Sequence, residues 1–261
     1  MTTADARVVF VAGGTSGINF AVAEHYAALG CRVAVLSRSQ ENVDAAVRAL
    51  RDSGADAIGY AADVRDAEAV DNAFARTADA WGSIDVLISG AAGNFAAPAS
   101  ELSPRGFETV VDIDLVGTFN VMRAAWGRLA TPGAAIVNVT AAQSWLPIPG
   151  QIHVNAAKAG IDQVTRTLAV EWGPHGIRVN SVAPGPVSGT EGMRRLAPTE
   201  SSVKAWTEAV PLRRFAETDD VVRAIDWLCS DAASYVTGQV LSVDGGLALG
   251  GAGAIASAIT S

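Results

Sequence analysis

The chain has 261 residues with a formal net charge of −8, and 49% of its residues are hydrophobic while 18% are charged. This composition is typical of a folded domain, and the acidic balance argues against broad nucleic-acid binding, which needs a basic face. Apolar runs all fall short of the roughly 20 residues that a membrane helix requires, so no membrane partner is expected.

Short apolar runs alternate with helical patterns along the chain, as in successive βαβ units. The predicted strands are Arg7–Ala12, Arg32–Ser37, Asp56–Ala61, Ile84–Ser89, Ala134–Thr140, Arg178–Val182 and Val240–Val243. The predicted helices include Ile18–Leu29, Gln40–Ser53, Ala67–Trp81 and Ile152–Trp172. Because the strands are continuously apolar, both sheet faces must be covered. The pattern therefore predicts one doubly wound α/β domain of Rossmann type, with a seven-stranded parallel sheet and helices on both faces.

This single domain is expected to span residues 1–261, with its core at 7–246 and neither a linker nor an internal repeat. The polar segment 190–211 is either a pair of surface helices or a lid over a substrate site, and the sequence leaves both open. The Gly/Ala-rich tail 247–261 is expected to be loosely ordered or to make an oligomer contact.

A glycine-rich turn lies between the first predicted strand and the first predicted helix. Glycines there let the backbone approach a pyrophosphate, whose charge the helix N-terminus favours. A tight turn without a ligand would use the same glycines, but the position between strand and helix favours a cofactor. The residues expected to bind a dinucleotide at this turn are Gly13, Thr15, Ser16, Gly17 and Ile18.

The end of the second predicted strand carries Ser37 and Arg38. An acidic residue there would bind a ribose 2′-hydroxyl and repel a 2′-phosphate. A hydroxyl and a guanidinium instead suit a phosphate, which predicts NADP(H) as the cofactor. The alternative is that Arg38 is a solvated surface arginine.

Together with the glycine turn, Lys158 in the predicted helix Ile152–Trp172 makes residues 8–246 resemble the short-chain dehydrogenase/reductase family. In that family a tyrosine usually stands four residues before the lysine, and this chain has Val154 there. The usual asparagine and serine positions fall at Asp114 and at about Ala141. The resemblance further implies cofactor contacts from Asp63, Val64, Ala91, Lys158, Pro184, Gly185, Val187 and Thr190.

A third glycine is also usual in the family two residues after Gly17, and this chain has Asn19 in its place. That glycine permits a close approach of backbone or ribose, so the pyrophosphate geometry is expected to differ slightly. Alternatively, the Asn19 amide donates a hydrogen bond to the cofactor.

Several stretches resemble one branch of the family, the peroxisomal-type 2,4-dienoyl-CoA reductases. They are Ala91–Phe95, Asp112–Asn120, Leu168–Pro174 and Pro184–Gly192. Members of that branch have an acidic residue at the place of Asp114 and no tyrosine before the lysine. The resemblance thus implies NADPH-dependent reduction of a 2,4-dienoyl-CoA to a 3-enoyl-CoA, with hydride transfer to Cδ and protonation at Cα.

In this chemistry Asp114 and Lys158 are the expected catalytic residues. Lys158 would hold the nicotinamide ribose and supply positive potential near the developing enolate. Asp114 would position a water that delivers the proton, unless it is a buried structural aspartate. An acyl-CoA substrate is expected to contact Arg65, Phe95, Gln151, His153 and Arg195, although ordinary packing remains an alternative for His153.

Two other hypotheses stay open: a short-chain reductase or dehydrogenase for a different activated alkene or carbonyl, and a catalytically inactive NADP(H)-binding regulator. The resemblance also implies a homotetramer built through the helices 105–130 and 152–172 and the last strand. Cys31 and Cys229 lack metal-ligand spacing, so no metal site is expected. Since neither a secretory signal nor a peroxisomal address is visible, the expected location is cytoplasmic.

Overall fold

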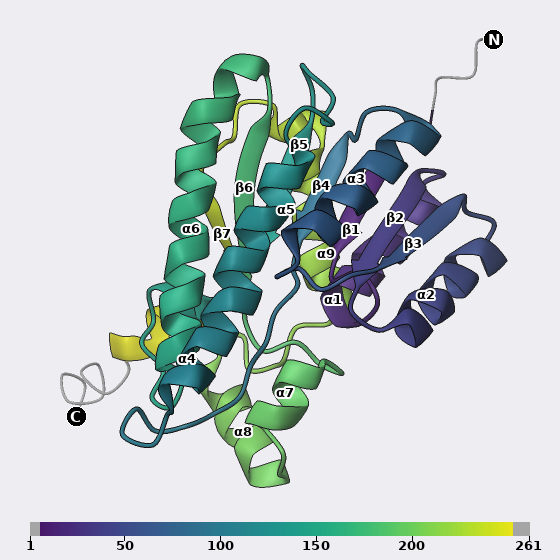
Figure 1. The fold of residues 1–261 in the computed structure, drawn as a ribbon. Helices are drawn as coiled ribbons and strands as arrows, with labels where there is room; N and C mark the ends of the chain where they lie inside the picture. Colours follow the sequence, from purple (N-terminus) through teal and green to yellow (C-terminus); the bar gives the residue numbers. More distant parts are fainter. Residues whose placement is uncertain (1–5, 253–261) are drawn as a thin grey trace.

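A computed structural model of the protein describes residues 6–252 (Figure 1). Its seven-stranded sheet has the order β3-β2-β1-β4-β5-β6-β7, and every neighbouring pair is parallel. The strands are β1 (Val8–Ala12), β2 (Arg32–Ser37), β3 (Ala57–Ala61), β4 (Val86–Ser89), β5 (Ala135–Val139), β6 (Arg178–Pro184) and β7 (Val240–Val243). This confirms the predicted doubly wound parallel sheet.

Helices cover both faces of the sheet (Figure 1). They are α1 (Gly17–Ala28), α2 (Gln40–Asp52), α3 (Ala67–Trp81), α4 (Pro104–Val111), α5 (Gly117–Ala125), α6 (Ile152–Trp172), α7 (Glu191–Leu196), α8 (Glu200–Ala209) and α9 (Thr218–Cys229). Among the described residues, no helix is both long and apolar enough to cross a membrane.

Successive side chains of β1 point to opposite faces of the sheet. Each face therefore has its own hydrophobic core. Phe10 packs with Phe74 of α3, with ring centroids 4.0 Å apart, in the core that α3, α5 and α6 cover. Val9 and Val11 belong to the opposite core, together with Tyr26 of α1 and residues of α2 and α9. Burial on both faces explains why the strands read as continuous apolar runs.

The strand order reverses between β1 and β4, since the chain runs outward from β1 to β3 and then returns beside β1. The register places Val9 of β1 opposite both Val33 of β2 and Val86 of β4. In open parallel sheets the crevice beyond the carboxyl ends of the strands at such a reversal is the usual ligand site. The segments that follow Ala12 and Ser89 are therefore where a ligand site is expected.

The long helix expected around Arg105–Ala130 is present but contains a π turn and ends at Ala125. Helix α4 passes through this π-helical turn, η1 (Asp112–Val116), into α5 without leaving the helical conformation. Helix α5 ends because Trp126 leaves the helical conformation and Gly127 adopts a φ of 82°. The π turn widens the helix by one residue at Asp114, and such turns are frequent at functional sites.

The segment 190–211 forms the short helices α7 and α8. Thr190 caps α7, and Thr199 with Ser202 forms a reciprocal capping box at the start of α8. Of the predicted tail, Leu247–Ala252 forms a short 3-10 helix, and residues 253–261 lie outside the described part of the chain.

Candidate active site

Two adjoining pockets open beyond the carboxyl ends of the strands at the β1/β4 reversal. The larger has a volume of about 490 Å³ and the smaller about 270 Å³. Residues that line both pockets include Ser16, Asn19, Arg38, Gly90 and Ala92. Together the pockets form one continuous surface from the end of β2 to the lid helices α7 and α8.

The glycine turn forms a close cradle at the junction of the two pockets. Gly13 has a φ of 81°, and a Cβ atom added there would lie 2.8 Å from the backbone nitrogen of Ala91. Gly17, with a φ of 54°, begins α1, and the side chain of the N-cap residue Ser16 makes no capping hydrogen bond. The first-turn N–H groups of a helix have no partner within the helix. The turn therefore fits the pyrophosphate of a dinucleotide.

At the adenosine end of such a cofactor, Ser37, Arg38 and Val64 line the smaller pocket. Asp63 does not line it, and its carboxylate accepts two hydrogen bonds from the Arg65 side chain, at 3.0 and 2.6 Å. This guanidinium lowers the pKa of Asp63. Arg65, expected to contact the substrate, is thus paired with Asp63 and lines neither pocket.

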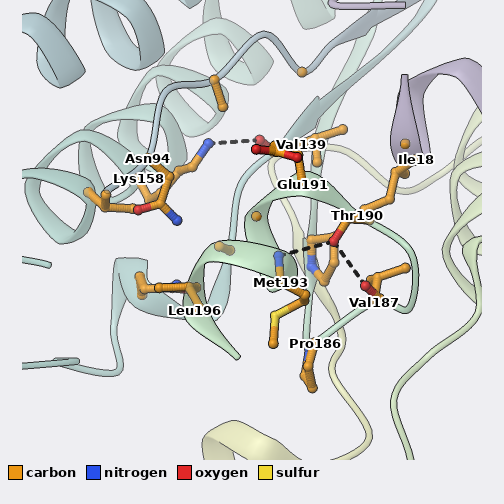
Figure 2. A pocket seen from close by; sticks show the side chains of 18 of the residues that line it. Ile18, Asn94, Val139, Lys158, Pro186, Val187, Thr190, Glu191, Met193 and Leu196 are labelled. Carbon is orange, nitrogen blue, oxygen red and sulfur yellow. Dashed lines mark hydrogen bonds between the residues drawn. The ribbon is translucent and has the colours of Figure 1, made fainter. Parts of the chain in front are cut away.

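Asp114 and Lys158 form a buried ion pair in the larger pocket. The Asp114 Oδ2 atom lies 3.1 Å from Lys158 Nζ, and the two side chains are 1% and 8% exposed. The other carboxylate oxygen accepts a 2.7 Å hydrogen bond from the backbone N–H of Gly93. Lys158 also lies within 3.4 Å of the carbonyl oxygen of Val139 (Figure 2). These additional partners fix the position of both groups in the buried pair.

The wall beside this pair is apolar. Val154, at the tyrosine position, is 3% exposed and lines the pocket together with Val139, Ala141 and Ala142. The nearby hydroxyl group of Thr140 donates to the backbone carbonyl of Lys158 at 3.4 Å. Since valine and alanine exchange no protons, Asp114 and Lys158 are the acid–base side chains of this wall among the described residues.

Phe95, Gln151 and His153 do not line the pocket. The His153 ring is fully buried with its centroid 4.4 Å from that of Phe95. Burial lowers the pKa of His153, while the Phe95 backbone and the Asp114 carboxylate act weakly in the opposite direction. Gln151 donates to Asn94 Oδ1 at 2.8 Å and so supports a residue that does line the pocket.

Residues of the segment 190–211 line the opposite side of the larger pocket. In Figure 2, Asn94 and Lys158 lie on one side, with Thr190 and Val187 on the other. Arg195 of α7 donates to the Asn94 carbonyl at 3.0 Å and to Glu191 at 2.9 Å. The cofactor positions predicted on this side, Gly17, Ile18, Pro184, Gly185, Val187 and Thr190, all line the pocket.

Sequence reasoning missed the apolar surface that faces the ion pair. The residues concerned are Ile148, Met193, Leu196, Trp206 and Leu247. They come from four separate segments, so no local spacing signals that they meet. Among the described residues, no group of histidine, cysteine, aspartate and glutamate side chains could hold a metal ion.

Comparison with known proteins agrees with this architecture. The family model described as Enoyl-(Acyl carrier protein) reductase matches residues 12–248. A short chain dehydrogenase from Bacillus anthracis, known from a crystal structure, superimposes with a TM-score of 0.85 at 35% sequence identity, covering 92% of this chain and 96% of that chain. The chain therefore belongs to the short-chain dehydrogenase/reductase family, which uses nicotinamide cofactors, and it is an oxidoreductase.

Two relatives indicate the branch. The chain is 45% identical over 242 residues to the peroxisomal 2,4-dienoyl-CoA reductase ((3E)-enoyl-CoA-producing) of Rattus norvegicus, covering 92% of this chain and 83% of the relative. It is 36% identical over 244 residues to the probable 2,4-dienoyl-CoA reductase ((2E)-enoyl-CoA-producing) of Bacillus subtilis, covering 92% and 96%. The resemblance drawn from the sequence is confirmed.

Proposed function

We propose that the protein uses NADPH to reduce a 2,4-dienoyl-CoA to a 3-enoyl-CoA. The observation that carries the proposal is the buried Asp114–Lys158 pair beside Val154. A site for carbonyl reduction needs a group that protonates oxygen as hydride arrives, and this wall offers no phenol. A conjugated dienoyl thioester takes the proton on carbon instead, after its charge has spread to the thioester oxygen.

The proposed cofactor is NADPH rather than NADH. Bound NADPH supplies the hydride that arrives at Cδ. At the end of β2 the pocket presents Ser37 and Arg38 and no carboxylate of its own strand. A guanidinium there is suited to a 2′-phosphate. The Asp63 carboxylate, which follows β3, is already paired with the Arg65 guanidinium at 2.6 Å.

The charge of the dienolate is balanced by this chain's own residues. Lys158 is held in place by Asp114 and by the Val139 carbonyl, so its ammonium group need not reorganise during the reaction. Positive potential in a site of low exposure stabilises developing negative charge more strongly than it would in water. We assign to the same ammonium a second role, binding of the ribose hydroxyls of the nicotinamide half.

Protonation at Cα is assigned to a water molecule positioned by Asp114. Each Asp114 oxygen already has one partner, and a carboxylate retains further lone pairs that accept hydrogen bonds from water. The proton that reaches Cα is replaced from solvent, so the balance is one NADPH and one proton for each dienoyl-CoA reduced. The 3-enoyl product follows from protonation at Cα; protonation at Cγ would give the 2-enoyl product that the Bacillus subtilis relative's name states.

The test is the loss of NADPH absorbance with 2,4-hexadienoyl-CoA and 2,4-decadienoyl-CoA, followed by mass and NMR analysis of the product. Crotonyl-CoA and acetoacetyl-CoA serve as controls for isolated alkenes and for carbonyls. We expect turnover with the dienoyl substrates alone and a double bond between C3 and C4 in the product. Turnover of acetoacetyl-CoA alone, or of no acyl-CoA despite NADPH binding, would overturn the proposal.

A further inference from the structure

Asn19 occupies the first turn of α1, where the family usually has its third glycine. Its side-chain Nδ2 donates to the carbonyl oxygen of Gly90 at 2.8 Å, so one of its two N–H groups is used within the protein. The residue is 8% exposed, and its Oδ1 atom is buried with no hydrogen-bond partner among the described residues. A buried amide with one unsatisfied atom costs free energy, so the contact calls for an explanation.

The Asn19 side chain fills the space beside Gly90 in which a larger residue would place its Cβ atom. A Cβ atom added at Gly90 would lie 2.4 Å from both Asn19 Nδ2 and Asn19 Oδ1. Real Cβ atoms essentially never approach heavy atoms so closely, so the amide occupies the place of a side chain at position 90. The large residue at 19 and the small residue at 90 therefore form a complementary pair that fixes the distance between α1 and the segment after β4.

The segment Gly90–Phe95 is held at three further points. The backbone N–H of Gly93 donates to the catalytic carboxylate of Asp114 at 2.7 Å. The carbonyl of Asn94 accepts from Arg195 of the lid at 3.0 Å, and its side-chain oxygen accepts from Gln151 at 2.8 Å. One short segment thus contacts helix α1, the Asp114 carboxylate and helix α7.

We propose that Asn19 is a positioning residue that transmits the position of the cofactor-binding turn to the active-site segment Gly90–Phe95. Asn19 and Gly90 both line the two adjoining pockets, so a cofactor bound across the junction lies against this pair. Cofactor binding orders the first turn of α1. Through the Asn19–Gly90 contact, it also restrains the segment Gly90–Phe95, which includes the hydrogen bond from Gly93 to Asp114. The inference concerns cofactor binding and does not depend on the identity of the acyl substrate.

Three variants test the contact: Gly90→Ala, Asn19→Gly, and the double variant Asn19→Gly/Gly90→Ala. Dissociation constants for NADPH and NADH are measured by cofactor fluorescence, and thermal unfolding shows that each variant is folded. For the cofactor that wild type binds more tightly, we expect Gly90→Ala to weaken binding about tenfold, which corresponds to about 1.4 kcal/mol. The double variant should recover most of this loss, because the new methyl group fills the vacated space. Gly173→Ala, with no atom within 4 Å of the added carbon, is the control.

Hydrogen exchange separates positioning from simple packing. In wild type, saturating NADPH should slow exchange in peptides that cover both residues 13–18 and residues 90–95. In Asn19→Gly we expect slowing at 13–18 to persist while slowing at 90–95 is largely lost. Wild-type cofactor affinity in Gly90→Ala overturns the proposal, as does a double variant that binds no better than Gly90→Ala. Changes confined to the melting temperature, or unaltered slowing at 90–95 in Asn19→Gly, also overturn it.

Discussion

At the level of single side chains, removing one partner of the Asp114–Lys158 pair should lower the free energy of unfolding more than removing both partners. Asp114→Asn leaves a buried ammonium group without its counter-ion, and removing one partner of a buried pair costs about 3–5 kcal/mol. We expect turnover of the dienoyl-CoA to fall by about 10²–10⁴-fold, the usual range for a positioned acid–base group. Lys158→Met should lose turnover as well and also weaken cofactor binding.

Steady-state kinetics, cofactor titration and urea unfolding of the two single variants and of Asp114→Leu/Lys158→Met check this prediction. The double variant should be more stable than either single variant yet inactive, because it removes both buried charges. Near-normal turnover in Asp114→Asn would contradict the assigned role of the carboxylate.

Arg38 should decide between the two nicotinamide cofactors. If its guanidinium binds a 2′-phosphate, Arg38→Ala should weaken NADPH binding by about 10–100-fold, the range for a lost charge-assisted bond, and leave NADH binding nearly unchanged. Isothermal titration with both cofactors measures the ratio. Arg48→Ala, which removes another exposed arginine, provides the matched control and should leave both affinities unchanged. An equal loss of affinity for both cofactors would show that Arg38 does not bind the 2′-phosphate.

His153 should make the folded state sensitive to acid. Burial lowers the pKa of His153 from its ordinary 6.5, so the unfolded chain takes up this proton first as the pH falls. Stability from this residue is therefore fully present above about pH 6.5 and is lost below it, towards the folded pKa. His153→Phe should reduce the loss of unfolding free energy between neutral pH and pH 5, measured by urea unfolding. His175→Gln, an exposed site, should keep the wild-type dependence.

At the level of secondary-structure elements, Arg195 links helix α7 to the segment after β4. Arg195→Ala removes its hydrogen bonds to the Asn94 carbonyl and to Glu191, whereas Arg194→Ala removes only an ion pair with Glu191. We expect Arg195→Ala to raise KM for the acyl-CoA several-fold and to speed proteolysis within 190–211. Exposed ion pairs contribute about 0–1 kcal/mol, so Arg194→Ala should behave like wild type. Equal changes in KM and proteolysis for the two substitutions would show that the hydrogen bond from Arg195 to Asn94 does not hold α7 in place.

The sequence predicted the structure best where a local pattern of residues is compatible with a single backbone conformation. Apolar runs predicted every strand of the sheet, and the turn from Gly13 to Gly17 lies where a strand-to-helix cradle was expected. The π turn at Asp112–Val116 was not foreseen, because one extra residue in a helical turn barely alters the spacing of apolar residues. Likewise, Arg65 is placed by its bond to Asp63, and the apolar lid surface arises only when distant segments meet.

At the level of the whole molecule, we propose that the protein assembles as a homotetramer through the outer face of α5 and α6. Both helices expose apolar side chains on the same side of the sheet: Phe119 of α5 is 55% exposed and Val170 of α6 is 77% exposed. Large apolar side chains that cluster on one face are typical of association surfaces. Leu29, at the end of α1 on the opposite face, is 61% exposed.

The double substitution Phe119→Asp/Val170→Asp should therefore dissociate the tetramer, because each subunit interface would bury unpaired carboxylates. Light scattering coupled to size-exclusion chromatography should show a mass near 107 kDa, about four times the chain mass of 26.7 kDa, for wild type and for the control Leu29→Asp. The double variant should elute as dimers or monomers with an unchanged far-UV circular dichroism spectrum. Since the pockets lie at the carboxyl edge of the sheet, cofactor affinity should survive dissociation. A wild-type monomer, or a tetramer that resists both charges, would place the interface elsewhere.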